Sequence, residues 1–161
     1  MAHGDESAYR AALAGALRIL SVRDHSVAEI TRKLARRGYA EDVVLAVVTE
    51  CLRLNYLDDR RSLDQAIDRL KRKGCGVRRI RMELAQKGLA GAAAEDRLRE
   101  SFGSGEERAV ALAAARRKWK ALQTEPDPRK RVQRLQRFLY SRGFSEGIIY
   151  EVSKELDALS T

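Results

Sequence analysis

Apolar residues recur at spacings of three and four along almost the whole chain, whereas alternation of apolar and polar residues over the length of a strand is absent. Spacing of three and four places apolar side chains on one face of an α-helix, so the pattern predicts an all-α fold. No proline precedes Pro126, and a proline inside a helix would break it. Start and stop signals predict nine helices, over residues 8–22, 26–37, 41–53, 60–73, 77–87, 91–102, 106–122, 129–142 and 145–158.

Helix starts and breaks carry further signals. We interpret the adjacent carboxylates Asp58 and Asp59 as caps of the helix that follows them, because negative charge suits the start of a helix. The spacing of a capping box, serine followed three residues later by glutamate, occurs as Ser26 with Glu29 and as Ser104 with Glu107. Turns or hinges are predicted at GCG (74–76), GSG (103–105) and PDP (126–128).

A short motif of apolar residues and a glycine occurs three times, at offsets of 50 and 55 residues. Its copies are Ile30, Leu34, Gly38 and Tyr39; Ile80, Leu84, Gly88 and Leu89; and Leu135, Leu139, Gly143 and Phe144. A long predicted helix precedes each copy and another helix follows it. Recurrence of this kind is typical of repeat proteins, so we predict three tandem three-helix repeats in an elongated, curved arrangement. The predicted repeats span residues 1–57, 58–103 and 104–161.

The glycine of the motif predicts how each motif helix ends. A left-handed glycine just past a helix allows the apolar residue after it to pack against the residue at the third position from the helix end, which is the Schellman termination. This interpretation pairs Leu34 with Tyr39, and it pairs the corresponding residues of the other two copies. We therefore interpret the glycine as part of the architecture rather than as part of a ligand site.

Charge is the next informative feature. The 161 residues include 32 Lys and Arg against 23 Asp and Glu, for a net charge of +9, which favours an acidic or polyanionic partner. Most of the excess lies in residues 60–87, with 10 basic and 3 acidic side chains, and in residues 116–142, with 10 and 2. Solvated surface is the ordinary interpretation of one arginine. Whole blocks are harder to explain in this way, because like charges three or four residues apart destabilise a helix.

Two aromatic or titratable residues near these features have alternative interpretations. Trp119, within RRKWK, could stack on a nucleic-acid base, although packing in the core or between repeats is the favoured interpretation. His25 precedes a predicted capping serine and has no partner in the sequence, so packing is favoured over acid–base chemistry. Neither residue by itself defines a site.

The sequence contains no catalytic constellation, whether a glycine-rich phosphate loop, a histidine pair at metal spacing or a nucleophile motif. Cys51 and Cys75 lack the spacing of a zinc site and are predicted to be free thiols. We therefore expect a protein that is not an enzyme and has no cofactor or metal. No segment has the pattern of a leader peptide or a membrane span, and the cytoplasm is the expected location.

Several segments in order resemble the RecX family, the small bacterial regulators of the RecA recombinase. They are LRILSVRDHSVAEITRKLARRGY, CLRLNYLDD, LKRKGCGVRRIRMELAQKGL and FLYSRGFSEGII, and the resemblance runs from about Leu17 to Leu156. It implies tandem three-helix units. It also implies binding in the helical groove of the RecA filament on single-stranded DNA, which lowers ATP hydrolysis, strand exchange and RecA-stimulated repressor cleavage.

Two classes of binding protein and one class of enzyme remain open at this stage. The leading hypothesis is a monomeric RecA regulator that binds the filament, and single-stranded DNA weakly and without sequence preference, with no membrane partner. A direct DNA-binding protein of the helix-turn-helix kind is the alternative, and a hydrolase or nuclease is the least favoured. The expected contacts are Arg78, Arg79, Arg81, Arg131, Arg134 and Arg137, followed by Lys73, Arg116, Arg117 and Lys118.

Overall fold

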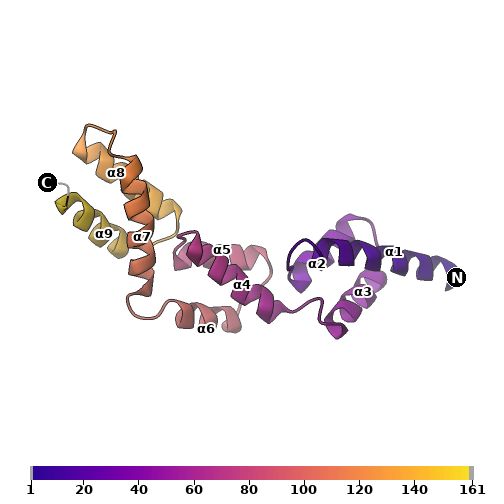
Figure 1. The fold of residues 1–161 in the computed structure, drawn as a ribbon. Helices are drawn as coiled ribbons and strands as arrows, with labels where there is room; N and C mark the ends of the chain where they lie inside the picture. Colours follow the sequence, from indigo (N-terminus) through magenta and orange to yellow (C-terminus); the bar gives the residue numbers. More distant parts are fainter. Residues whose placement is uncertain (1, 160–161) are drawn as a thin grey trace. The chain divides into compact units, whose positions relative to one another are not determined.

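The computed structural model describes residues 2–159, with side chains from residue 6 onward, and this part of the chain contains nine α-helices and no strand (Figure 1). The predicted all-α fold with nine helices is therefore confirmed. Each helix begins and ends within two residues of its predicted bounds, except that the first helix begins six residues earlier than expected. The helices are α1 (Ala2–Leu20), α2 (Val27–Arg36), α3 (Glu41–Arg53), α4 (Asp59–Arg72), α5 (Val77–Gln86), α6 (Ala92–Ser101), α7 (Glu106–Ala121), α8 (Pro128–Ser141) and α9 (Glu146–Ala158).

The helices form two compact units that do not follow the sequence continuously. Unit 1 holds the chain up to Asp64 together with Ala85–Leu89, and unit 2 holds Gln65–Leu84 together with the chain from Ala90 onward. Helices α4 and α5 thus contribute residues to both units. None of the helices in the described range combines the length and apolarity that a bilayer crossing requires.

The core of unit 1 is made by α1, α2 and α3, which pack against one another. Ile30 and Leu34 of the repeated motif are fully buried, as are Val47 and Cys51 on the inner face of α3. These positions are spaced by four residues, so one face of each helix enters the core. Both cysteines are buried free thiols, as predicted.

The core of unit 2 includes α7, α8 and α9, which lie side by side (Figure 1). The motif residues Leu135, Leu139 and Phe144 are fully buried, and Trp119 is only 6% exposed among them. The indole ring is thus a packing group, which decides between the two interpretations of Trp119. His25, in unit 1, is likewise buried, with Nδ1 2.9 Å from the carbonyl oxygen of Arg23.

The motif glycines end their helices as predicted. Gly38 has a φ of +85°, and the amide of Tyr39 donates to the carbonyl oxygen of Leu34. The same bond joins Phe144 to Leu139 after Gly143. Each amide after a glycine thereby satisfies a carbonyl group that the helix end would leave unpaired.

Side-chain capping agrees with the sequence at two places and differs at two. The capping box of Ser26 and Glu29 is present at the start of α2, and the Asp58 carboxylate accepts from the amide of Arg61. The predicted box of Ser104 and Glu107 is wrong, because Gly105 is the N-cap of α7 and makes no side-chain bond. Asp59 lies in the first turn of α4, where its negative charge was predicted, but its carboxylate caps a different helix.

The two carboxylates that differ from prediction cap helices that lie earlier in the sequence. Asp59 accepts from the amide of Val27, at the start of α2, over 2.8 Å. Glu107 accepts from the amide of Val77, at the start of α5, over 3.0 Å. In each case the helix that opens one predicted repeat caps the motif helix of the repeat before it. The sequence pattern indicates local caps only, so these long-range partners were missed.

A second recurring contact joins successive motif helices. In unit 1 the hydroxyl group of Ser26 donates to the carbonyl oxygen of Lys87. In unit 2 the amide of Gly76 donates to the carbonyl oxygen of Arg142. The carbonyl group belongs in each case to the residue before a motif glycine. Gly143 lies so close to α5 that a Cβ atom on it would be 2.3 Å from the amide nitrogen of Arg79. The predicted turn at GCG is therefore part of a close-packed joint.

Candidate anion-binding site

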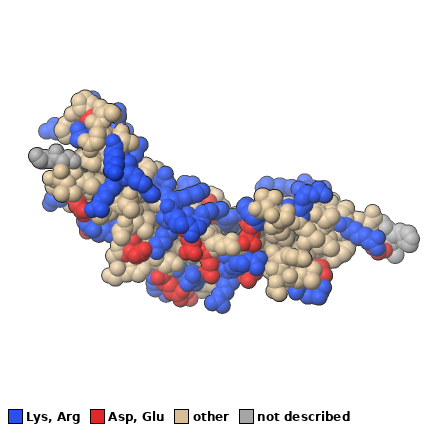
Figure 2. Space-filling view, viewed as in Figure 1, with Lys and Arg blue, Asp and Glu red and all other residues tan. Residues whose placement is uncertain are grey.

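The net charge of the molecule lies almost entirely in unit 2. Its residues include 21 Lys and Arg and 13 Asp and Glu, against 11 and 10 in unit 1. In the view of Figure 2, cationic side chains gather over α4, α5 and α7, while acidic side chains gather over α6. An anion-binding site is therefore expected in unit 2.

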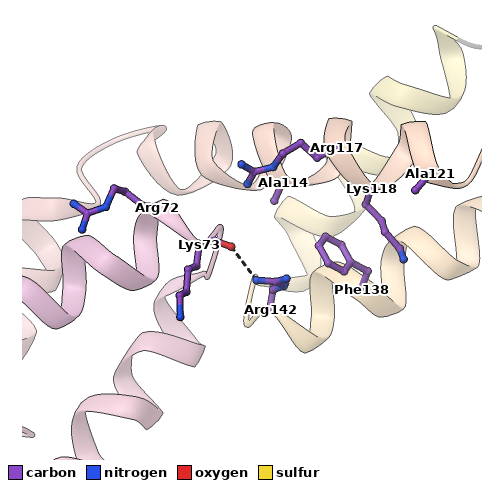
Figure 3. A pocket seen from close by; sticks show the side chains of 8 residues that line it. All are labelled: Arg72, Lys73, Ala114, Arg117, Lys118, Ala121, Phe138 and Arg142. Atoms are coloured by element: carbon purple, nitrogen blue, oxygen red, sulfur yellow. Dashed lines mark hydrogen bonds between the residues drawn. The ribbon is translucent and has the colours of Figure 1, made fainter. Parts of the chain in front are cut away.

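A cavity of about 330 Å³ lies where the ends of α4 and α8 meet α7, and we call it the basic cavity (Figure 3). Five of its eight lining residues are cationic and none is acidic. The remaining three residues are two alanines and a phenylalanine. The lining consists of Arg72, Lys73, Ala114, Arg117, Lys118, Ala121, Phe138 and Arg142.

The corner after α4 brings these side chains together. Gly74 has a φ of +74° and ends α4, and the amide of Cys75 donates to the carbonyl oxygen of Leu70. A Cβ atom on Gly74 would lie 3.0 Å from that of Ala114 on α7 and 3.2 Å from Nη2 of Arg117. The glycine thus allows the end of α4 to approach α7, which places basic residues of both segments around one space.

Arg142 connects the ends of α4 and α8. Its guanidinium Nη1 donates to the carbonyl oxygen of Lys73 over 2.8 Å. Figure 3 shows the Arg142 side chain between Lys73 and the ring of Phe138. The guanidinium carbon lies 5.0 Å from the centroid of that ring, and the ammonium group of Lys118 lies 5.6 Å from it. Cation–π contacts therefore hold two of the cations in place.

No carboxylate in the described part of the chain forms an ion pair with the cations of the basic cavity. Cations that converge without a counter-charge raise the local potential, and an anion that enters the space relieves this repulsion. Arginine can present two parallel N–H groups to a phosphate or a carboxylate. The arrangement is therefore suited to binding an anion, and it contains no nucleophile or general base.

Three of the predicted contact residues meet in the basic cavity, namely Lys73, Arg117 and Lys118. Sequence reasoning placed them second, and it missed Arg72 and Arg142. Arg72 adjoins Lys73 in the same basic block, so its position was available as a signal. Arg142 precedes the motif glycine of the third copy, and only the packing of α8 against the end of α4 shows its role.

Four predicted contacts are engaged with carboxylates of the same chain. The pair of Arg81 with Glu95 is bidentate, at 2.7 and 2.9 Å, and the hydrogen bond from Arg81 lowers the pKa of Glu95. Such pairs reduce the charge that these arginines offer to a partner. The other pairs are Arg79 with Glu83 at 2.9 Å, Arg134 with Glu125 at 2.9 Å and Arg116 with Glu155 at 3.7 Å.

The remaining predicted contacts differ from one another in their surroundings. Arg78 lies 4.2 Å from the ring centroid of Tyr140 and donates to the carbonyl oxygen of that residue. Arg131 is half-buried and lies over the Trp119 ring at 5.6 Å. Arg137 is exposed. It lines a cavity with Tyr140, Glu146 and Tyr150. Of the six arginines predicted first, Arg137 is the one that makes no ion pair and no cation–π contact within the described residues.

These observations define a class: a small all-α protein built from three-helix segments, with a cationic cavity in one unit and no catalytic grouping in that cavity. Two family models agree with this architecture. The model described as the first three-helix domain of RecX matches residues 12–51, and the model described as the third matches residues 106–152.

The chain belongs to the RecX family of regulatory proteins. It is 38% identical over 141 residues to the regulatory protein RecX of Vibrio parahaemolyticus, covering 87% of this chain and 88% of the relative. It is also 38% identical over 157 residues to that of Escherichia coli O9:H4 (strain HS), covering 90% and 91%. The crystal structure of RecX from Lactobacillus salivarius, at 19% identity, has the same fold, with a TM-score of 0.74 over 95% of this chain and 99% of that one.

Proposed function

We propose that this chain is a negative regulator of the RecA recombinase. It binds in the groove of the RecA filament on single-stranded DNA and lowers ATP hydrolysis, strand exchange and stimulated repressor cleavage. Membership of the RecX family supports the proposal, and so does the concentration of positive charge in unit 2. The chain acts in the cytoplasm as a monomer, and its action needs no cofactor.

The observation that carries the proposal is the basic cavity, with five cations and no acidic residue in its lining. A filament of a recombinase on single-stranded DNA offers both acidic side chains and phosphate groups, and either would relieve the repulsion among these cations. The bridge between Arg142 and Lys73 also fixes the site before a partner arrives. A site that is already ordered loses less conformational entropy on binding.

Among the exposed residues, Arg137 is the best additional contact on α8. Arg81 and Arg134 contribute less, because each is paired with a carboxylate of its own chain. Sequence-specific reading of duplex DNA has less support. The helix that follows the first motif corner begins with the exposed acidic residues Glu41 and Asp42, which repel phosphate groups.

The test is a titration of RecA filaments on single-stranded DNA with the purified chain. At each ratio of chain to RecA, the rate of ATP hydrolysis is measured, and the length of the filaments is measured by electron microscopy. We expect hydrolysis to fall with increasing protein and the filaments to shorten or disappear. The variant Lys73→Glu/Arg117→Glu should require at least about tenfold more protein for the same effect, a difference of about 1.4 kcal/mol in binding.

The matched control is Arg36→Glu/Arg37→Glu, which changes the net charge by the same amount on exposed residues of unit 1. It should inhibit hydrolysis nearly as well as the unmodified chain. Hydrolysis that stays unchanged at every ratio of chain to recombinase would refute the proposed function. Equal loss in both variants would show that total charge, and not the basic cavity, determines inhibition.

A further inference from the structure

A second cavity adjoins the basic cavity and shares two residues with it. It has a volume of about 510 Å³ and is likewise formed in unit 2 by the ends of α4 and α8 together with α5. Lys73 and Arg142, which are joined by a hydrogen bond, line both spaces. The second lining consists of Arg69, Leu70, Lys73, Cys75, Arg79, Glu83, Ser141 and Arg142.

The second cavity also offers donors with few counter-charges. Nε of Arg69 is buried and has no hydrogen-bond partner in the described structure. Glu83 is the one acidic residue in this lining, and Arg79 holds its carboxylate at 2.9 Å. Within the described structure a carboxylate pairs with one of the four cations in this lining, so an anion in the cavity could accept hydrogen bonds from Arg69, Lys73 or Arg142.

We propose that the two cavities form one track for a single-stranded polynucleotide, with consecutive backbone phosphates on either side of the Lys73–Arg142 bridge. This inference rests on the proposed function in taking the strand from a nucleic-acid filament. It goes beyond the expected weak binding of single-stranded DNA in assigning the strand contacts to named residues of the two cavities.

The arrangement fits a polymer of phosphates better than a single anion. Seven cations line the two spaces together and are spread over the ends of α4 and α8, over α5 and over α7. A single phosphate group would contact only some of them. A nucleic-acid strand carries one charge per nucleotide, so it can occupy both cavities at once and gain from each.

The arrangement also fits a single strand better than a duplex. Side chains from several segments surround each space, so a bound phosphate must turn inward to meet them. A single strand is flexible enough to turn its phosphates toward a groove, as in other proteins that follow a strand through its backbone. A duplex holds its phosphates along a stiff helix. The planar guanidinium groups of Arg117 and Arg142 suit phosphate oxygens in two-point contact.

The test measures fluorescence anisotropy of a labelled oligothymidylate of about 20 nucleotides as the full-length chain is added at about 50 mM NaCl. We expect saturable binding that weakens with salt. The slope of log affinity against log salt should be about −2 to −3, corresponding to three or four neutralised phosphates on a single strand. The matched duplex should bind at least about tenfold more weakly.

Lys73→Glu/Arg117→Glu should lower the affinity for the oligonucleotide at least about tenfold and make the slope shallower. Arg117→Gln is a milder second variant of an exposed side chain, and it should lower the affinity several-fold with an unchanged melting temperature. The control Arg36→Glu/Arg37→Glu should lie within about twofold of the unmodified chain.

Three results would contradict the proposed track for a single strand. One is equal weakening in the cavity variant and the control, and another is duplex binding as tight as single-strand binding. The third is full competition by pyrophosphate or by polyglutamate at the same charge concentration, which would indicate a single-anion site or a site for an acidic protein. Intact strand binding with no effect on the recombinase would contradict the proposed function alone, whereas inhibition without strand binding would contradict the track alone.

Discussion

At the scale of single residues, Glu29 joins the start of α2 to the end of α5 within unit 1. Its carboxylate accepts from the amide of Ser26, from Arg23 at 2.9 Å and from Lys87 at 3.1 Å. Burial is the largest single influence and would raise the pKa of Glu29. The hydrogen bonds from Arg23, Ser26 and Lys87 together outweigh it and lower the pKa to about 2.

This low pKa predicts how acid affects stability. The folded form binds its proton only near pH 2, whereas an unfolded glutamate binds its proton near pH 4.3. Glu29 therefore stabilises the fold fully above about pH 5.5, and this contribution is lost as the pH falls toward 2. Its size is about 3 kcal/mol. Glu29→Gln should lower the urea midpoint at pH 7, and its difference from the unmodified chain should vanish near pH 2.

Circular dichroism during urea unfolding at several pH values measures this effect. The matched control is Glu6→Gln, since Glu6 is largely exposed in its pair with Arg10. That substitution should change the midpoint little at any pH, because exposed ion pairs contribute little to stability. A Glu29→Gln difference that stays constant from pH 7 to pH 2 would show that the carboxylate has an ordinary pKa.

At the scale of elements, the joint between the motif helices α5 and α8 depends on glycine for two separate reasons. Gly143 has a φ of +86°, which disfavours any residue with a Cβ atom. It also lies directly against the backbone of Arg79. Gly105, at the start of α7, has a similar φ of +80° but open space where its Cβ atom would be. Comparing the same substitution at the two glycines therefore separates the cost of backbone strain from the cost of disturbed packing.

Gly105→Ala should cost about 1–2 kcal/mol from the left-handed backbone alone. Gly143→Ala should cost a further 1–3 kcal/mol or so, because α5 and α8 must move apart. In a chain of this size the melting temperature should therefore fall at least about 3 °C further for Gly143→Ala than for Gly105→Ala. Both sites lie in unit 2, so the fluorescence of Trp119 reports both effects. Equal melting temperatures of the two variants would show that α5 and α8 can move apart at Gly143 without loss of stability.

At the scale of the whole molecule, the uneven charge of the two units predicts how the chain would meet the recombinase filament that we propose as its partner. Unit 2 carries almost all of the net charge, and charge of one sign accelerates encounter with an opposite surface. Raising NaCl from about 50 to about 200 mM should lower the association rate with recombinase filaments several-fold, while the dissociation rate changes less.

Interferometry with immobilised filaments separates these two rates. Arg36→Glu/Arg37→Glu should keep the salt dependence of the unmodified chain, because unit 1 is close to neutral. Lys73→Glu/Arg117→Glu should reduce that dependence. An association rate that does not change with salt would place the steering charge elsewhere.

Sequence reasoning predicted the helices and their corners well, because these features depend on neighbouring residues. The spacing of Ile30 and Leu34 identifies a buried face, and Gly38 identifies the corner after it. The capping box at Ser26 was also visible from four residues. Local propensities and short hydrogen-bonded turns act within one or two helical turns, so the order of residues is sufficient to find them.

What only the tertiary structure decided is which charges remain available. Arg81 and Arg117 look alike in the sequence, yet Arg81 is bound by Glu95 and Arg117 lines a cavity without acidic residues. Arg142 is part of the basic cavity because α8 ends against the end of α4, and no local sequence pattern indicates this contact. The sequence by itself determined nine helices, a repeated corner and an excess of positive charge. The packing of helices distant in the sequence determined where that charge lacks a partner, since ion pairs and cavities depend on distances in space.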